Sequence, residues 1–273
     1  MIHTPVSANV NANMNANVNA KTAMNFKRIA LKLSGEALKG EALKGEALKD
    51  EVLRGEAFDN DTASFNIPFI EKFVANIIAC ASQYEIVLIV GGGNFFRGKE
   101  SEKLNISSVK ADQMGMLATI MNGLLLKEIF TQQGQKATVM SNVFCPSICD
   151  VFQVDRANSL LKEGHVLICV GGTSVPCFTT DTAVVLKAFE LNCQLIMKAT
   201  KVKGIFSQDP IKYPKAQFYQ KLSFDEVISQ GLNVMDQTAF EMARSHHIPI
   251  VVFSVLEALE DVLKGKCEFT LVS

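Results

Sequence analysis

Three consecutive glycines directly after an apolar run constrain the fold of this chain most. The run Ile86-Val87-Leu88-Ile89-Val90 is typical of a buried strand, and Gly91-Gly92-Gly93 follows it at once. Glycine permits left-handed backbone conformations and lets another molecule come close to the backbone. Consecutive N–H groups in such a turn form a concavity suited to phosphate oxygens. The sequence therefore predicts a strand that ends in a phosphate-binding cradle.

Arg97 follows the cradle and has the charge and fork shape that match a phosphate. Two alternatives stay open for this run. It could be a glycine-rich turn with a solvated arginine, or Arg97 could form a structural ion pair.

Strand-like and helix-like segments alternate from Phe26 onward, which favours a parallel or mostly parallel sheet covered on both faces. Ligands bind such sheets at the carboxyl ends of the strands. On the second predicted helix the apolar residues share one face, which predicts that this face is buried: Met114, Leu117, Ile120, Met121, Leu124 and Leu125. The predicted strands are 29–33, 86–90, 137–140, 166–170, 194–198 and 249–253, and the predicted helices lie near 69–78, 114–134, 156–163, 181–191, 236–245 and 256–264.

Composition excludes several classes of protein. With 273 residues, a net charge of -1 and 48% apolar residues, the chain can bury a large core but lacks the basic balance of a nucleic-acid-binding protein. No apolar run approaches the ~18 residues of a membrane span. Seven scattered cysteines without a Cys-x-x-Cys pair predict reduced thiols in a cytoplasmic protein. The four histidines lack metal-ligand spacing.

Two segments stand apart from the predicted domain. Residues 1–25 are rich in asparagine and alanine and predict a disordered tail, while 26–273 predict a single domain. The sequence Gly-Glu-Ala-Leu-Lys occurs at 35–39, 40–44 and 45–49, and a degenerate copy follows at 55–58. We interpret the 35–58 region as an expanded surface loop.

Five motifs follow one another along the chain: 27–38, 91–98, 112–123, 178–183 and 198–206 with Asp209-Pro210. Their sequences and order resemble those of the bacterial UMP kinases of the amino-acid-kinase superfamily. The block Asp112-Gln113-Met114-Gly115-Met116-Leu117-Ala118-Thr119-Ile120-Met121-Asn122-Gly123 is particular to those kinases within the superfamily. The resemblance extends from about Phe26 to Val272.

The resemblance implies the amino-acid-kinase fold, a three-layer α/β/α sandwich with a mostly parallel central sheet. It implies transfer of a phosphoryl group from ATP to UMP by a homohexamer, with Lys32, Arg97 and Asp181 as catalytic residues. Mg²⁺ comes with ATP and is held mainly by phosphates and water, because no carboxylate cage is visible. The implied ATP-binding residues are Lys32, Leu33, Ser34, Gly35, Gly93, Arg97, Thr200, Phe206 and Asp209. The implied UMP-binding residues are Gly92, Asp112, Thr173, Ser174, Val175, Pro176, Cys177, Phe178, Thr179 and Thr180.

Several of these residues also have structural interpretations. Lys32 and Lys198 could extend from strand ends into water. Asp112 and Asp181 stand where an aspartate commonly caps a helix, although the resemblance implies that Asp112 binds the UMP ribose and Asp181 orients Lys32. Phe206 could be an ordinary core residue.

The chain departs from the UMP kinase pattern at Ser174 and Val175, where the family has Gly and Asn, and at Lys203. Two other functions stay open. One is a superfamily kinase acting on carbamate or acetylglutamate, which the 112–123 block disfavours. The other is a non-catalytic nucleotide- or anion-binding protein, which Lys32, Arg97 and Asp181 disfavour.

Overall fold

The computed structural model describes residues 26–39, 64–96 and 105–273. The predicted tail 1–25, the repeat copies beyond residue 39 and Arg97 lie outside the described residues. The first repeat copy is described, and it differs from a surface loop. It forms the short helix α2 (Gly35–Leu38), in which Gly35, Ala37 and Leu38 are buried.

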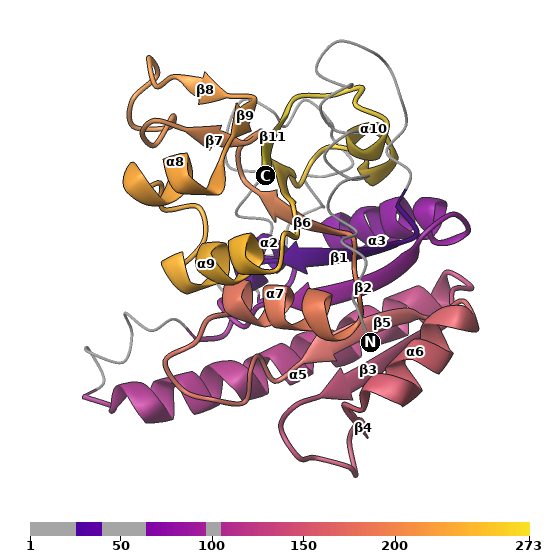
Figure 1. Ribbon diagram of the computed structural model, residues 1–273. Helices are drawn as coiled ribbons and strands as arrows, with labels where there is room; N and C mark the ends of the chain where they lie inside the picture. The colour runs from indigo at the N-terminus through magenta and orange to yellow at the C-terminus, as the bar shows by residue number, and fades with distance from the viewer. Residues whose placement is uncertain (1–25, 40–63, 97–104) are drawn as a thin grey trace, which may run out of the picture.

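A nine-stranded sheet runs through the described part of the chain, in the order β4-β3-β5-β2-β1-β6-β10-β11-β9 (Figure 1). Its neighbouring strands are parallel except for the antiparallel pair β10–β11. A separate pair joins β7 (Ile205–Phe206) to β8 (Phe218–Tyr219). The strands of the large sheet are β1 (Arg28–Leu33), β2 (Glu85–Val90), β3 (Ala137–Ser141), β4 (Asp150–Val151), β5 (Val166–Val170), β6 (Leu195–Thr200), β9 (Lys221–Leu222), β10 (Ile250–Ser254) and β11 (Phe269–Val272).

Two apolar clusters, one on each face of the sheet, confirm the predicted three-layer α/β/α sandwich. The first cluster holds residues of α2, α3 (Ile67–Ala81), α5 (Ser108–Gln132) and α10 (Leu259–Leu263). The second holds residues of α6 (Val154–Lys162), α7 (Thr180–Glu190), α8 (Phe224–Ser229) and α9 (Gln237–Ser245). Figure 1 shows α7 and α9 together over the same side of the sheet.

Strand alternation assigns the side chains of β1 to these two layers. Ile29, Leu31 and Leu33 belong to the first cluster, and Ala30 belongs to the second. Because successive side chains of a strand point to opposite faces, Lys32 lies on the face covered by α7. β1 thereby places the side chain of Lys32 on the side of the sheet that holds the second apolar cluster.

The predicted strands and the longer helices are confirmed to within a few residues. The sequence analysis missed α2, α8, β4, β7, β8, β9 and β11, which have two to six residues each. Elements this short do not complete enough periods for a hydrophobic pattern to reveal them. None of the described helices is long and apolar enough to cross a membrane.

The predicted buried face of α5 is wrong in part. Met114, Leu117 and Met121 are 42%, 55% and 51% exposed, whereas the polar Thr119 and Asn122 are buried. Ile120 is buried as predicted, and Leu124 and Leu125 pack against the core, so the apolar residues of this helix are divided between the core and an exposed face. A pattern of apolar residues cannot by itself distinguish a core from a surface that another chain covers.

Small residues let α5 approach the sheet closely. A Cβ atom added to Gly123 would lie 2.4 Å from Cγ1 of Val170 on β5. Val170 is a buried, β-branched strand residue, so it has little freedom to move away. By contrast, a Cβ added to Gly115 of the same helix meets nothing within 4 Å.

We expect Gly123→Ala to lower the free energy of unfolding by about 1–3 kcal/mol, because overpacking outweighs the gain in helix propensity. Gly115→Ala is the matched control and should raise the free energy of unfolding by up to about 1 kcal/mol. Urea titration of both variants checks this. Equal effects of the two substitutions would show that the contact with Val170 is unimportant.

Candidate active site

The carboxyl ends of four adjacent strands bring the predicted site residues together. β1 leads into Ser34 and Gly35, β2 into the glycine loop (residues 91–94), β5 into the β5–α7 loop (171–179), and β6 ends at Thr200. This is the edge where ligands bind sheets of this kind.

A buried cluster of one carboxylate and two ammonium groups lies at the centre of this edge. Lys32 and Lys198 are directly paired in the register of β1 and β6. Lys32 Nζ lies 2.9 Å from Oδ1 of Asp181, and Lys198 Nζ lies 2.6 Å from Oδ2. Although Lys32 is this close, Oδ1 accepts no well-directed hydrogen bond from the described residues, so that contact is ionic. Lys32 and Lys198 are only 6% and 7% exposed, so the water-exposed interpretation is wrong for both.

The cluster shifts the pKa values of its members in the direction that keeps Asp181 charged. Burial alone would raise the pKa of Asp181, but the charges of Lys32 and Lys198 outweigh burial and lower it. Burial and the charge of Lys32 lower the pKa of Lys198 to about 8. A buried carboxylate between two cations therefore holds both lysine side chains in place.

Asp181 reaches this position through the first turn of α7. It is not the helix cap, because the N-cap is Thr179, whose hydroxyl accepts a hydrogen bond from the Asp181 N–H. The Thr179 hydroxyl also donates to Asp236, which caps α9 and accepts from Thr182. The sequence analysis missed Asp236, whose only sequence signal was its place at the start of the predicted helix 236–245.

Close packing explains the glycines of the cradle. A Cβ added to Gly35 would lie 2.4 Å from the nitrogen of Gly93 and 2.7 Å from the carbonyl oxygen of Gly91. A Cβ added to Gly92 would lie 2.6 Å from the carbonyl oxygen of Gly115 on α5. Gly91, Gly92 and Gly93 do not have positive φ angles, so the expected left-handed conformations are absent here. These glycines let two loops and a helix meet.

The β5–α7 loop is held to α5 by Asp112. Its Oδ2 accepts a hydrogen bond of 2.7 Å from the Cys177 N–H. Asp112 lies inside α5, and the N-cap is Ser107, so the capping interpretation of Asp112 is wrong. A carboxylate has acceptor sites for more than one donor, so this bond leaves room for the predicted ribose contact.

Two of the three departures from the UMP kinase pattern, Ser174 and Val175, lie in the same loop, and Lys203 lies between β6 and β7. Ser174 and Cys177 have φ angles of 61° and 74°. Such angles are uncommon for residues other than glycine, which explains why a glycine suits position 174. Val175 and Phe178 are exposed, and the Thr173 hydroxyl bonds within the loop to Val175. Pro176 of this loop and Thr180, the first residue of α7, are partly exposed.

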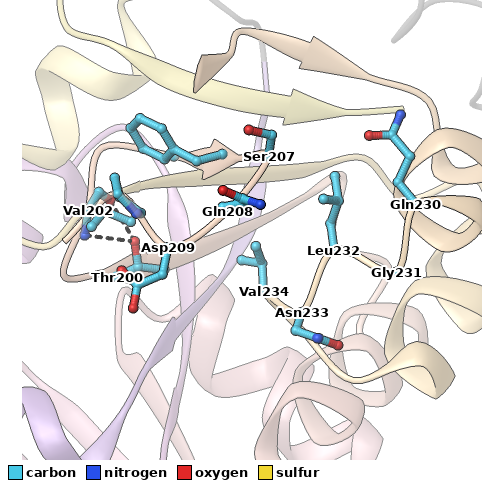
Figure 2. A pocket seen from close by; sticks show the side chains of 13 residues that line it. Thr200, Val202, Ser207, Gln208, Asp209, Gln230, Gly231, Leu232, Asn233 and Val234 are labelled. Carbon is cyan, nitrogen blue, oxygen red and sulfur yellow. Dashed lines mark hydrogen bonds between the residues drawn. The ribbon is translucent and has the colours of Figure 1, made fainter. Parts of the chain in front are cut away.

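A pocket of about 540 Å³ opens beside β6 and β7. It is lined by Thr200, Phe206 and Asp209, the three residues predicted on the ATP side. Figure 2 shows Thr200 and Asp209 on one side of the pocket and Leu232 and Asn233 on the other. Val234 also lines the pocket, and its carbonyl oxygen accepts a hydrogen bond from Lys198 Nζ. The pocket is thus directly connected to the Lys32–Asp181–Lys198 cluster.

Within the described residues, no three His, Cys, Asp or Glu side chains are grouped so that they could hold a metal ion. Asp181, the carboxylate at the centre of the site, is already occupied by two lysines.

The lowered pKa of Lys198 predicts a pH-dependent stability. Unfolding restores the ordinary pKa of 10.5, so between pH 8 and 10.5 the unfolded chain binds more protons than the folded chain. Stability should therefore rise with pH across this range. Relative to Lys198→Met, the wild type should gain about 2 kcal/mol between about pH 7 and about pH 9.5.

Urea unfolding at both pH values measures that gain, with Lys127→Met, on the exposed side of α5, as the control. A pH-independent difference between wild type and Lys198→Met would contradict the proposed burial of this ammonium group.

Comparison with known proteins agrees with this geometry. Residues 27–254 match the profile of the Amino acid kinase family. A uridylate kinase of Magnetococcus marinus is 41% identical over 249 residues, which cover 90% of this chain and 95% of the relative. The crystal structure of UMP kinase from Ureaplasma parvum has a TM-score of 0.80 at 29% identity and covers 92% of this chain and 100% of that one.

The UMP kinase structure from Bacillus anthracis has a TM-score of 0.76 at 30% identity and covers 91% of this chain and 96% of that one. Similarity therefore extends over nearly the whole length of proteins with one activity. This chain belongs to the amino acid kinase family and, within it, to the group that contains these uridylate kinases.

Proposed function

We propose that this protein transfers the γ-phosphoryl group of ATP to UMP and forms UDP, a step of pyrimidine nucleotide biosynthesis. The observation that carries the proposal is the Lys32–Asp181–Lys198 cluster, which lies between the glycine loop and the 540 Å³ pocket. Relatives named uridylate kinase support the choice of acceptor. Phosphoryl transfer between two polyanions depends mainly on positioning and on neutralisation of charge.

The cluster supplies that neutralisation. Two lysines and one aspartate carry a net positive charge in a buried site, where charge acts strongly on a nearby phosphate. Lys32 stabilises the phosphoryl group in transfer, and Arg97, which lies outside the described residues, adds a second charge. Asp181 orients the lysines and does not act as a base, because the attacking UMP phosphate is already ionised near neutral pH.

The donor nucleotide enters as the Mg²⁺–ATP complex. Its adenosine occupies the pocket of Thr200, Phe206 and Asp209, and its phosphates extend toward Ser34, Gly35 and Gly93. The phosphates and water hold the metal, because Mg²⁺ commonly keeps several waters and binds through substrate phosphates.

UMP occupies the opposite side of the cluster, between Gly92, Asp112 and the β5–α7 loop. The single donor of the Thr179 hydroxyl is used by Asp236, so any further bond of this hydroxyl is as an acceptor. Uracil presents a donor at N3, whereas cytosine presents an acceptor there. This difference favours UMP over CMP.

We further propose that the protein is a cytoplasmic homo-oligomer, a hexamer by resemblance. The exposed apolar face of α5, formed by Met114, Leu117 and Met121, is the surface that another subunit would cover. All seven cysteines are free thiols, which supports a reducing compartment.

A substrate panel tests the proposed function. Purified protein with Mg²⁺ and ATP should release ADP fastest with UMP, more slowly with CMP and dTMP, and not with carbamate or acetylglutamate. An unpaired buried polar group costs about 1–3 kcal/mol, so the preference for UMP over CMP should be about tenfold or more. Equal rates with UMP and CMP, or binding without turnover, would refute the proposal.

Lys32→Ala should nearly abolish turnover while the protein still folds. Its ammonium acts most strongly in the transition state, and Lys32→Arg should not restore the rate, because a planar fork differs from a compact ammonium. Lys27→Ala is the control, since the Lys27 side chain is 76% exposed. Steady-state kinetics decides: if Lys32→Ala retained more than about a tenth of the rate, its share of the barrier would be below ~1.4 kcal/mol, too small for this role.

A further inference from the structure

Two polar side chains of helix α5 bond to loops of the candidate active site but have no role in the proposed chemistry. Thr119 and Asn122 are only 2% and 0% exposed, although both side chains are polar. They are three residues apart and therefore lie on one face of the helix. Each bonds to a different loop of the active site.

Asn122 holds the glycine loop. Its Nδ2 donates to the carbonyl oxygen of Gly91 at 2.6 Å and to Oδ1 of Asn94 at 2.7 Å. Asn94 returns a hydrogen bond of 2.9 Å to Oδ1 of Asn122 and donates to the carbonyl oxygen of Ser64. Each amide nitrogen has two hydrogens, and all four hydrogens of this pair are used. The pair therefore fixes the loop in one conformation.

Thr119 holds the start of the β5–α7 loop. Its hydroxyl donates to the carbonyl oxygen of Met116 within α5 at 2.7 Å and accepts from the Gly171 N–H at 2.7 Å. Gly171 is buried and has a φ angle of 78°. Without the hydroxyl, its N–H would be buried and unpaired, which is unfavourable.

We propose that Asn122 and Thr119 are positioning residues, through which α5 sets the distance between the glycine loop and the loop that carries the acceptor. The inference rests on the proposed function for the assignment of ligands to the two loops. Neither residue touches substrate. They act because a rigid helix links two loops that must stand at a fixed separation for in-line transfer, and small misplacements are costly.

The two residues should have separable effects. Loss of the Asn122 amide frees the glycine loop beside the phosphoryl group, so we expect Asn122→Ala to lower kcat about tenfold or more. Because Gly92 of this loop also borders UMP, the KM for UMP should rise, but less than in Thr119→Val. Loss of the Thr119 hydroxyl frees the acceptor loop, so Thr119→Val should raise the KM for UMP about tenfold, with a smaller change in kcat. Thr119→Ser keeps the hydroxyl and should behave as wild type.

Amide hydrogen exchange of the ligand-free protein gives a readout that does not depend on the identity of the substrate. Asn122→Ala should speed exchange in residues 91–96 and leave 171–177 unchanged, and Thr119→Val should do the reverse. Thr131→Val is the matched control, because the Thr131 hydroxyl donates to the Lys127 carbonyl oxygen within α5, at the far end of the helix from both loops. If Asn122→Ala does not fold, Asn122→Ser, which keeps one donor, takes its place.

The outcomes separate this inference from the proposed function. Exchange that rises in one loop for each variant, together with the kcat and KM split, supports positioning by α5. Exchange that rises equally in both loops, or a lower melting temperature with unchanged kinetic constants, would reduce both residues to a structural role. If the wild-type protein does not phosphorylate UMP while the two variants still show loop-specific changes in exchange, the proposed function is refuted and the positioning of the loops by α5 is supported.

Discussion

Two lysines stand side by side on neighbouring strands, and the active site depends on the carboxylate that makes this possible. Strands of a sheet are about 4.8 Å apart, so Lys32 and Lys198, paired in register, place two ammonium groups in one buried space. Like charges at this distance repel strongly where water is scarce. Asp181 offsets the repulsion by contacting both. Because Asp181 belongs to the first turn of α7, the same contacts hold that helix to the sheet.

The cluster also orders the surrounding loops. The Thr179 cap places Asp181, and the Thr179 hydroxyl is in turn bound to Asp236 at the start of α9. Lys198 donates to the carbonyl oxygen of Val234, which lines the pocket. The charged cluster, the first turns of α7 and α9, and the pocket wall at Val234 are therefore linked by one network of hydrogen bonds and ion pairs. Networks of this kind make a site rigid and specify one arrangement of its side chains.

Helix α5 departs from the usual amphipathic pattern in part, although Ile120, Leu126 and Phe130 are buried as in an ordinary helix of this kind. Its buried side carries Thr119, Asn122 and Gly123, and its outer side carries Met114 and Leu117. The small inner residues bring the helix close to β5, and this closeness lets the polar side chains reach the loops at the strand ends. The apolar outer face is then left for contact with another subunit, as we propose above.

The sequence by itself determined the layers of the fold and the edge of the sheet where the site lies. Apolar strands alternating with amphipathic helices fit few arrangements, and turn residues after several strands mark one edge. Lys32 and Asp181 were also predicted as site residues, by resemblance and by their place beside apolar runs, and the structure brings these two side chains together. What tertiary structure alone decided is which side chains meet. Asp112 and Cys177, or Asn94 and Asn122, are far apart in the chain. Their contacts follow from strand order and helix orientation, which a one-dimensional pattern does not encode. The outer face of α5 was mispredicted for the same reason, because hydrophobic periodicity records that a face is apolar but not what covers it.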